Sequence, residues 1–311
     1  MTNSNQKIIL VTQRTRLEDL IRRYNTYGQT EFIISHNGGD FADYRLEHEI
    51  YQGAMHTALS ALQTFGRVQV LDRDLVPNYL FGKQDIVVAV GRDGLVANVL
   101  KYLLDGQMLI GVNPDPKRWD GQLLPFFPED LSKILPEVLR GSRNVQSITL
   151  AQATLNDGQV LRAVNDLFIG RQTHASARYE ISQGGARESQ SSSGVIVSTG
   201  LGATGWLKSI LAGAVGIAKF YGIPAPAELS YPIDRSAPML FYTVREPYPS
   251  TATGANMVLG QITAKSPLQI VSHMPENGVI FSDGMEQDFL QFNSGAMVTI
   301  GIADQRGYLV V

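Results

Sequence analysis

The feature that most constrains the fold is the segment 85–113, in which a strand pattern, a helix pattern and a second strand pattern follow one another. Residues 86–90 are all apolar, which is typical of a strand that is covered on both faces. Apolar residues then recur at helical spacing over 95–104, and residues 109–112 suit a further strand. A strand, a helix and a strand in this order favour two parallel strands joined by a right-handed crossover. The first half of the chain is therefore predicted to be α/β, with a Rossmann-like parallel sheet.

The residues before this unit continue the alternation of strand and helix patterns. Lys7–Thr12 predicts a buried strand, and Thr15 and Glu18 fit a capping box at the start of a helix. That helix should end near Gly28, because glycine is favoured just beyond a helix C-terminus. The further elements expected here are a strand over 32–35, a helix over 44–65 and a strand over 68–71.

Beyond about residue 143 the pattern becomes mostly β. An Asp-Gly turn signal within 156–159 separates the strand patterns 148–155 and 160–169, and Gly184 and Gly185 separate 176–182 from 187–199. One helix is expected over 204–221, a simple turn over 282–284, and further strands over 240–244, 268–272, 279–281, 297–302 and 308–311. We therefore predict two domains, an α/β nucleotide-binding domain over 1–143 and a β-rich dinucleotide-binding domain over 144–311.

Composition excludes several classes of protein. Hydrophobic residues make up 44% of the chain and charged residues 18%, which rules out a disordered chain. A net charge of -3 does not suit a dedicated nucleic-acid binder. There is no cysteine, which excludes disulfide frameworks, thiolate metal centres and cysteine nucleophiles, and the five histidines lack paired ligand spacing. The polar start and the absence of any run of about 18 apolar residues predict a cytoplasmic protein with no membrane partner.

The first candidate site is Gly91-Arg92-Asp93-Gly94, which follows the strand 86–90 and opens the next helix. Ligands of open α/β sheets bind at such strand ends, because loop amides and the helix dipole converge there. Asp93 adds a carboxylate, although an ordinary turn in which Asp93 only caps the helix explains these residues equally well. The segment 111–116 ends the next strand, so Asn113 should face the same crevice, although a turn made by two prolines is the simpler interpretation.

Two polar segments in the second half suit a nucleotide. Asn165 and Asp166 need polar partners if they are buried, although a bulge or a strand end explains them almost as well. The segment 198–206, Ser-Thr-Gly-Leu-Gly-Ala-Thr-Gly-Trp, combines a flexible backbone with the hydroxyls of Thr199 and Thr204. Trp206 can stack on a base or pack in the core. The residues alone therefore support a nucleotide or phosphate site to which both halves contribute, and they do not name the reaction.

Taken in this order, the segments resemble the NAD kinase family, and its mitochondrial type most of all. The family pattern is Gly-Gly-Asp-Gly after a strand, a Gly-x-Asn strand end, an Asn-Glu or Asn-Asp pair, and a Thr- and Gly-rich segment before a helix. The matching segments of this chain are 91–94, 111–116, 165–170, 177–181, 199–206, 245–247 and 283–284. The resemblance covers about 85–311 well and 7–80 only in outline.

The resemblance implies a kinase that transfers a phosphoryl group from ATP to the 2′-hydroxyl of the adenosine ribose of NAD, which gives NADP. A divalent metal, Mg2+, would be bound through the phosphates. Asp93 matches the general base of the family. The residues that match nucleotide-binding positions are Gly91, Arg92, Gly94, Asn113, Asn165, Asp166, Thr199, Gly200, Gly202, Thr204, Gly205, Trp206 and Ser209. The resemblance also implies a homodimer or a higher homo-oligomer.

Departures from the family pattern leave alternatives open. Arg92 replaces the second glycine, and Ser193 stands where many members have an aspartate. Arg92 either clamps a phosphate of the donor, or fills the donor position and stops catalysis, or points to solvent. The alternatives to an NAD kinase are a non-catalytic dinucleotide-binding protein and a related kinase that acts on the hydroxyl of a sugar or a lipid head group.

Overall fold

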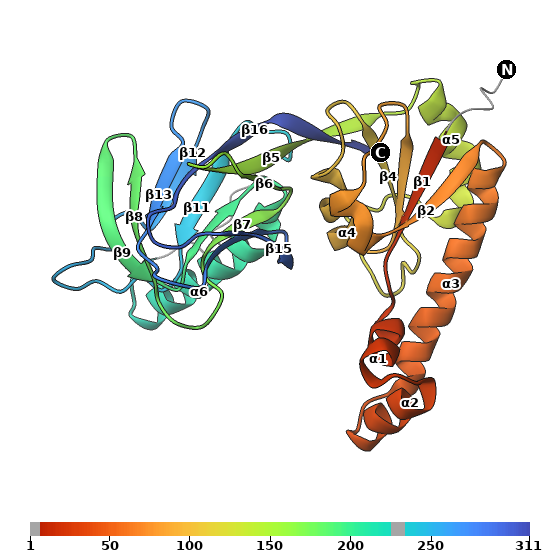
Figure 1. Ribbon diagram of the computed structural model, residues 1–311, viewed down its shortest axis with the longest axis horizontal. Helices are drawn as coiled ribbons and strands as arrows, with labels where there is room; N and C mark the ends of the chain where they lie inside the picture. The colour runs from red at the N-terminus through yellow and green to blue at the C-terminus, as the bar shows by residue number, and fades with distance from the viewer. Residues whose placement is uncertain (1–6, 225–233) are drawn as a thin grey trace. The chain divides into compact units, whose positions relative to one another are not determined.

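The computed structural model describes residues 7–224 and 234–311, and the chain divides into two compact units (Figure 1). Unit 1 comprises Met1–Gln146 and Tyr308–Val311, and unit 2 comprises Ser147–Gly307. Residues 1–6, which form most of the polar start, lie outside the described part. Within the described ranges, no helix is both long enough and apolar enough to cross a membrane.

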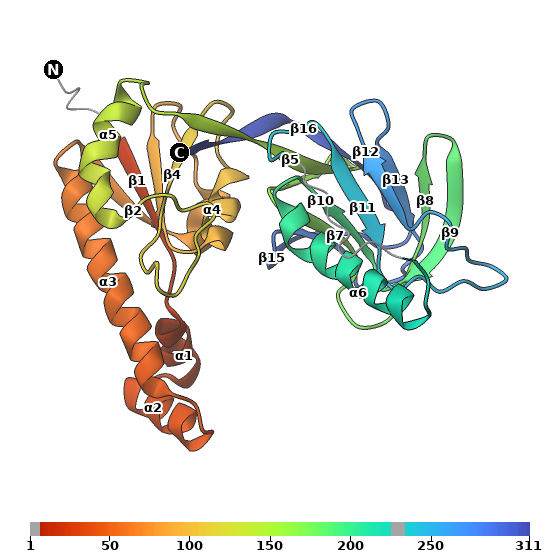
Figure 2. The same ribbon diagram turned by 180° about the vertical axis from the view of Figure 1, so that it is seen from behind.

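A parallel sheet forms the centre of unit 1 (Figure 2). Its strands lie in the order β2 (Arg67–Asp72), β1 (Lys7–Thr12), β3 (Ile86–Val90) and β4 (Met108–Val112), and all neighbours are parallel. The end of β16 (Met297–Val310) pairs with β4 in parallel through Tyr308 and Leu309. Every residue of β3 is buried, as its unbroken apolar run predicts. The predicted α/β class with a parallel sheet is confirmed.

Helices pack on both sides of this sheet. Ile8 and Leu10, which alternate along β1, join α3 (Phe41–Gln63) and α5 (Leu131–Leu139) in one apolar cluster. α4 (Asp93–Leu100) packs on β3 and β4 and lies on the opposite side of the sheet in both views (Figures 1 and 2). The helix predicted over 44–65 is confirmed as α3, whereas the sequence pattern does not predict α5.

Two short helices precede α3 and pack on its first turns. α1 (Arg16–Tyr24) and α2 (Tyr27–His36) share a small apolar cluster with Phe41. The predicted capping box is confirmed, because the Thr15 hydroxyl accepts the amide of Glu18 and the Glu18 carboxylate accepts the amide of Thr15. α1 ends earlier than predicted, at Asn25 with φ of 69°.

The predicted strand over 32–35 is wrong, since these residues belong to α2 and Gly28 lies near the start of the same helix. Thr26 caps α2, and its hydroxyl accepts the amide of Gln29. A run of three apolar residues does not distinguish a strand from a helix. Packing decides here, because Ile34 is buried in the cluster with Phe41 while Phe32 is exposed.

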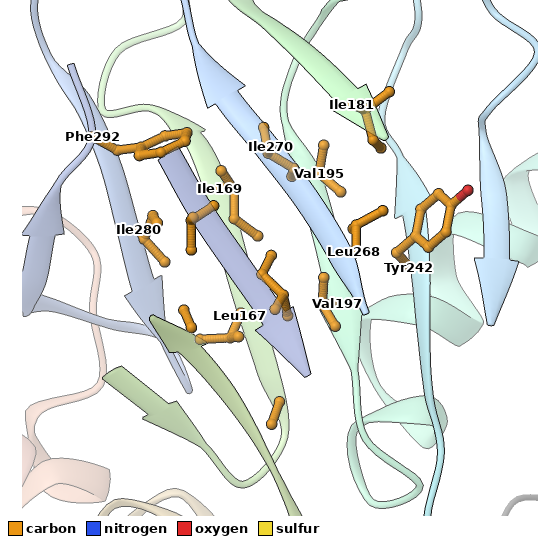
Figure 3. Close-up of a cluster of buried hydrophobic side chains, with 14 of the residues drawn as sticks. Leu167, Ile169, Ile181, Val195, Val197, Tyr242, Leu268, Ile270, Ile280 and Phe292 are labelled. Atoms are coloured by element: carbon orange, nitrogen blue, oxygen red, sulfur yellow. The ribbon is translucent and has the colours of Figure 1, made fainter. Parts of the chain in front are cut away.

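Unit 2 consists of two antiparallel sheets with a common core. One has the order β12 (Leu259–Ile262), β11 (Leu240–Val244), β10 (Val195–Ser198), β7 (Asp166–Arg171), β14 (Gly278–Ser282) and β15 (Met285–Gln291). In the other, β16, β13 (Leu268–Ser272), β8 (Ala177–Gln183) and β9 (Ala186–Ser192) lie in order, and β5 (Val145–Leu155) pairs with β16 and β6 (Val160–Ala163). Apolar side chains of both sheets, such as Ile169, Ile181 and Ile270, fill the space between them (Figure 3). The predicted β-rich second half is confirmed.

α6 (Trp206–Phe220) covers the outer face of the six-stranded sheet. Successive residues of β7 point to opposite faces, so Leu167 and Ile169 join the core between the sheets while Phe168 packs beneath α6. Trp206 and Ile210 of α6 lie against this outer face. The start of α6 is thereby fixed over the middle of the sheet.

Two predicted strands are each broken in two. Residues 160–169 form β6 and most of β7, and residues 187–199 form most of β9 and all of β10. At both breaks the chain leaves one sheet and enters the other. Gly194 at the second break has φ of +107°, a conformation that favours glycine. Conversely, the strands predicted over 297–302 and 308–311 belong to the single strand β16, which ends at Val310. The sequence pattern does not predict β12 or β15.

Candidate functional site

Gly91 and Arg92 join β3 to α4, and Asp93 and Gly94 open the helix, as the sequence predicts. Arg92 precedes the helix in an extended conformation, with φ of −107° and ψ of 166°. Its carbonyl accepts the amides of Leu95 at 2.8 Å and Val96 at 3.3 Å. Any residue adopts such a backbone, so the arginine replaces the glycine of the family pattern without strain.

Asp93 is the first residue of α4, where the helix dipole favours a negative charge. Its Oδ1 accepts the amide of Leu123 at 2.7 Å. Leu123 lies in residues 113–126, which follow β4 and which we call the β4 loop. The carboxylate therefore ties the start of α4 to the β4 loop. The interpretation of Asp93 as a helix cap is wrong, because Arg92 is the N-cap residue and no side chain of the described residues caps the helix.

Asn113 holds the β4 loop from within. Its Nδ2 donates to the carbonyl of Trp119 at 2.9 Å, and its Oδ1 accepts the amide of Asp115 at 3.0 Å. Two glycines permit the close fit: a Cβ on Gly111 would lie 2.1 Å from the Leu123 carbonyl, and one on Gly121 would lie 2.5 Å from Asn113 Nδ2. Asn113 is 3% exposed, so its amide group shapes the loop.

The Arg92 side chain contacts Trp119 and Glu47. Its guanidinium carbon lies 4.5 Å from the centroid of the indole ring, and its Nη2 lies 3.5 Å from Glu47 Oε1. Both partners belong to unit 1. The Arg92 side chain is therefore 38% exposed and also in contact with two side chains of unit 1.

Glu47 belongs to a group of ion pairs at the carboxyl ends of the parallel strands. Arg16 of α1 pairs with both Glu47 and Asp43 on α3, and Arg118 of the β4 loop pairs with Asp43. Arg118 and Arg16 hold the pKa of the Asp43 carboxyl well below its ordinary value. The pairs link α1, α3, the start of α4 and the β4 loop.

In unit 2, Asn165 and Asp166 lie at the start of β7, and Asp283 holds their backbone. The Asp283 carboxylate accepts the amides of Val164, Asn165 and Asp166, at 3.1, 2.6 and 3.3 Å. Asp283 itself has φ of 54° in the turn between β14 and β15. The predicted simple turn at 282–284 thus has a second role, because it fixes the predicted Asn-Asp pair.

The Asp166 carboxyl is buried beside two polar groups. The Ser198 hydroxyl donates to its Oδ1, and Asp283 lies nearby. The pKa of Asp166 is raised to about 7, chiefly by burial; the bond from Ser198 opposes the rise, and the neighbouring negative charge of Asp283 adds to it. This carboxyl therefore changes its protonation near neutral pH.

The segment 199–202 packs tightly against the same turn. The Thr199 hydroxyl donates to the Val164 carbonyl at 2.6 Å and accepts the amides of Leu201 and Gly202 at 3.2 Å. A Cβ on Gly202 would lie 2.2 Å from the Asn165 carbonyl, so this position requires glycine. Thr199, Gly200 and Gly202 are buried, and they join 164–166 in one cluster of predicted site residues.

The remaining predicted residues lie at the exposed start of α6. The Thr204 hydroxyl donates to the Leu201 carbonyl at 3.1 Å, and Ser209 donates to the Gly205 carbonyl at 3.2 Å. Thr204, Gly205 and Ser209 are all exposed. They are open to a ligand, whereas Thr199 and Gly202 determine the shape of the turn that presents them.

A cavity of about 410 Å³ adjoins Trp206 within unit 2. The Trp206 ring is parallel to Phe168 at 6.0 Å between centroids, and the Arg245 guanidinium lies 5.4 Å from the indole centroid. Trp206 thus packs in the apolar face of the sheet and also lines the cavity. Further walls of the cavity are formed by Phe281, Phe289, Arg171, His174, Ser193 and Glu246.

The sequence analysis does not single out most residues of this cavity. Arg245 and Phe168 fall within segments that carry the resemblance, but Arg171, His174, Phe281 and Phe289 carry no motif. One feature of the sequence indicates a binding residue here: Arg171 is a cation at the end of an apolar strand that begins with Asp166. Aromatic faces suit a base or nicotinamide ring, and guanidinium groups suit a phosphate.

Metal binding by protein side chains alone has no support in the described residues. In the ranges 7–224 and 234–311, no three or more His, Asp or Glu side chains lie together in a way that would hold a metal ion. The carboxylates of Asp93 and Asp166 each have a protein hydrogen bond instead.

Sequence comparison finds similarity to NAD kinases. The chain is 26% identical to "NAD kinase 2, mitochondrial" of Rattus norvegicus and to the protein of that name of Homo sapiens, over 250 residues in each case, covering 64% of this chain. It spans 59% of the length of the rat protein and 57% of the human one. The Xenopus tropicalis protein of the same name is 22% identical, with 96% of this chain and 88% of that protein covered. No family model matches the chain.

Structure comparison finds the same fold in solved NAD kinases. An NAD kinase from Archaeoglobus fulgidus in complex with ATP is 15% identical with a TM-score of 0.57, and 98% of this chain and 94% of that chain are covered. Yeast NADH kinase complexed with NADH is 15% identical with a TM-score of 0.59, covering 99% of this chain and 84% of that chain. The resemblance inferred from the motifs is thus confirmed, and the fold is that of NAD kinases.

Proposed function

From the premise that the chain is a distant relative of the NAD kinases, we propose that it transfers a phosphoryl group from ATP to the 2′-hydroxyl of the adenosine ribose of NAD. Three observations support the proposal: the shared fold, the similarity to mitochondrial NAD kinase 2, and the motifs in their family order. ATP and NADH are the ligands of the two solved relatives.

The cavity beside Trp206 is the observation that carries the proposal. Its four aromatic side chains, Phe168, Trp206, Phe281 and Phe289, suit one ring of a dinucleotide. Arg171 and Arg245 suit the negative charge of its phosphates. Thr204, Gly205 and Ser209, at the exposed start of α6, are proposed to contact the same ligand.

In unit 1, Asp93 is proposed to accept the proton of the ribose hydroxyl as the hydroxyl oxygen attacks the γ-phosphorus and ADP leaves. The amide of Leu123 donates to Oδ1 of the carboxylate and fixes its position. Gly94 is exposed at the N-terminus of α4, where amides and the helix dipole suit phosphate oxygens. Mg2+ is proposed to enter with the phosphates of ATP.

In unit 2, Asn165 and Asp166 are proposed to bind the nucleoside, in a geometry held by Asp283. Gly202 packs against the Asn165 carbonyl, and the Thr199 hydroxyl donates to the carbonyl of Val164, the residue before the pair. A homodimer or a higher homo-oligomer, and a cytoplasmic location, stay predictions.

The direct test is incubation of the purified chain with NAD, ATP and Mg2+, followed by detection of NADP with an NADP-specific dehydrogenase. NADP formation that stops without ATP supports the proposal. Binding of NAD without any NADP would instead identify a non-catalytic binder. ATP consumption with a sugar or a lipid head group, but not with NAD, would identify a kinase of another hydroxyl.

A further inference from the structure

Arg92 and Asp93 are consecutive residues, and both hold the β4 loop. The Arg92 guanidinium covers the Trp119 indole at 4.5 Å, and Asp93 Oδ1 accepts the Leu123 amide at 2.7 Å. The carbonyl of Trp119 is held in addition by Asn113 Nδ2 at 2.9 Å. The loop is thus fixed at two points, of which one bonds the carboxylate of Asp93.

We propose that Arg92 and Trp119 form a brace that positions the Asp93 carboxylate through the β4 loop. The role of Asp93 in phosphoryl transfer rests on the proposed function, whereas the brace rests on the contacts of unit 1. Arg92 is on this view a positioning residue. Where the family pattern has a glycine, this chain has an arginine that orients the neighbouring aspartate.

The partners of Arg92 argue against a clamp on the donor phosphate. The side chain of Glu47 is 8% exposed and also pairs with Arg16, so it forms a fixed anchor for Arg92. A guanidinium that moved to a phosphate would lose both the indole face and this carboxylate. Because a planar guanidinium stacks on an aromatic ring, these contacts favour one orientation of the Arg92 side chain.

A displacement of Trp119 reaches Leu123 because the backbone between these two residues has little conformational freedom. Gly121 has φ of +64°, and its carbonyl accepts the amide of Leu124 at 3.0 Å, which closes a tight turn. The Leu123 carbonyl lies against Gly111 so closely that a Cβ there would be 2.1 Å away. A displaced Trp119 therefore moves the Leu123 amide, and with it the donor that orients Asp93.

The test compares Arg92→Met and Trp119→Leu with the conservative variants Arg92→Lys and Trp119→Phe. Arg23→Met is a matched control, because it removes an exposed guanidinium 5.6 Å from the ring of Tyr24, on α1. Two quantities are measured: hydrogen exchange of peptides that cover 119–126, and kcat and KM for ATP. The exchange measurement needs no enzymatic activity.

We expect Arg92→Met and Trp119→Leu to speed exchange over 119–126 and to lower kcat about tenfold or more, since small misplacements of catalytic groups cost that much. KM for ATP should stay within about twofold, because no ground-state contact with the donor is removed. Arg92→Lys and Trp119→Phe should restore most of kcat, and the double variant Arg92→Met/Trp119→Leu should be no slower than either single variant.

Two results would overturn the brace. A raised KM for ATP with a parental kcat in Arg92→Met would make Arg92 a phosphate clamp. Parental exchange over 119–126 in Arg92→Met would show that Arg92 does not hold the loop. If the parent chain forms no NADP, the proposed function fails, and the exchange measurement still decides the brace.

Discussion

At the scale of single residues, Asp93 combines a structural contact with the proposed chemistry, and one substitution separates the two. Asn retains an Oδ1 that can accept the Leu123 amide, but it cannot take a proton. We therefore expect Asp93→Asn to lower kcat by about 10²–10⁴-fold, the usual contribution of a general base. The dissociation constant for NAD, measured by calorimetry, should change little.

Asp93→Ala serves as the comparison, because it loses the bond to the β4 loop as well. It should match Asp93→Asn in kcat and unfold at a lower denaturant concentration. Parental turnover in Asp93→Asn would exclude the role as a base.

Asp166 makes the stability of the folded protein depend on pH in a predictable way. Its pKa is ordinarily near 3.8 and is raised to about 7 in the fold, so the folded state holds a proton that the unfolded state releases. The free energy of unfolding should therefore fall as pH rises from about 4 through 7 and level off at about 8. In Asp166→Asn this contribution is absent, so the variant should gain stability over the parent as pH rises through that range.

The measurement is urea unfolding of both proteins at several pH values from 4 to 8. Asp304→Asn, an exposed carboxyl on β16, is the control for a change of net charge in unit 2. A difference between Asp166→Asn and its parent that stays constant across this range would contradict the assignment.

The residue types of the candidate site were accessible from the sequence, but their contacts were not. Spacing and composition single out Asp93, Asn113 and the pair Asn165-Asp166. The partner of Asp93 is an amide 30 residues away, and the pair is held by Asp283, which is 118 residues from Asn165. Such contacts depend on tertiary packing, which no local pattern records.

At the scale of elements, α6 presents one aromatic residue to the cavity at its start and another to solvent at its end. Trp206 is stacked on Phe168, whereas Phe220 is 84% exposed. We expect Trp206→Leu to raise the dissociation constant for NAD about tenfold or more, since stacking of one base contributes about 1–3 kcal/mol. Phe220→Leu, on the same helix, should leave it at the parental value.

Binding of NAD to the two variants and the parent is compared by calorimetry. Equal affinity in all three would remove Trp206 from the dinucleotide site and would leave the cavity without a ligand. A circular-dichroism spectrum like that of the parent shows that each variant retains the overall secondary structure.

Strand and helix patterns predicted the elements well where one element stays in one environment. β3, with every residue buried, and α3, with its long periodic stretch, are examples. They failed where tertiary structure interrupts a uniform pattern: 160–169 and 187–199 each pass from one sheet to the other. The short run at 32–35 failed for another reason, because the Thr26 cap and the packing of Ile34 make it helical.

At the scale of the whole molecule, a ligand that binds only the folded chain must stabilise it. NAD or NADP at a hundredfold excess over its dissociation constant should add about 2.7 kcal/mol to the free energy of unfolding. Thermal unfolding with NAD, NADH, NADP and ATP, each at several concentrations, measures the effect. If no dinucleotide at millimolar concentration raises the unfolding temperature, the result contradicts the proposed function, because substrate binding is its first step.

The strand β16 affects the order in which the molecule can fold during synthesis. The chain enters unit 2 at residue 147 and supplies the strand segment beside β4 only at Tyr308 and Leu309. At about 5–20 residues per second, translation of the intervening segment takes roughly 10–30 s. Residues 297–300 of the same strand pair with β13, so one sheet of unit 2 and the outer edge of β4 are both completed only when β16 is made. Until then β4 is paired, among the described strands, only with β3, and its other edge is open to chaperones and to other nascent chains.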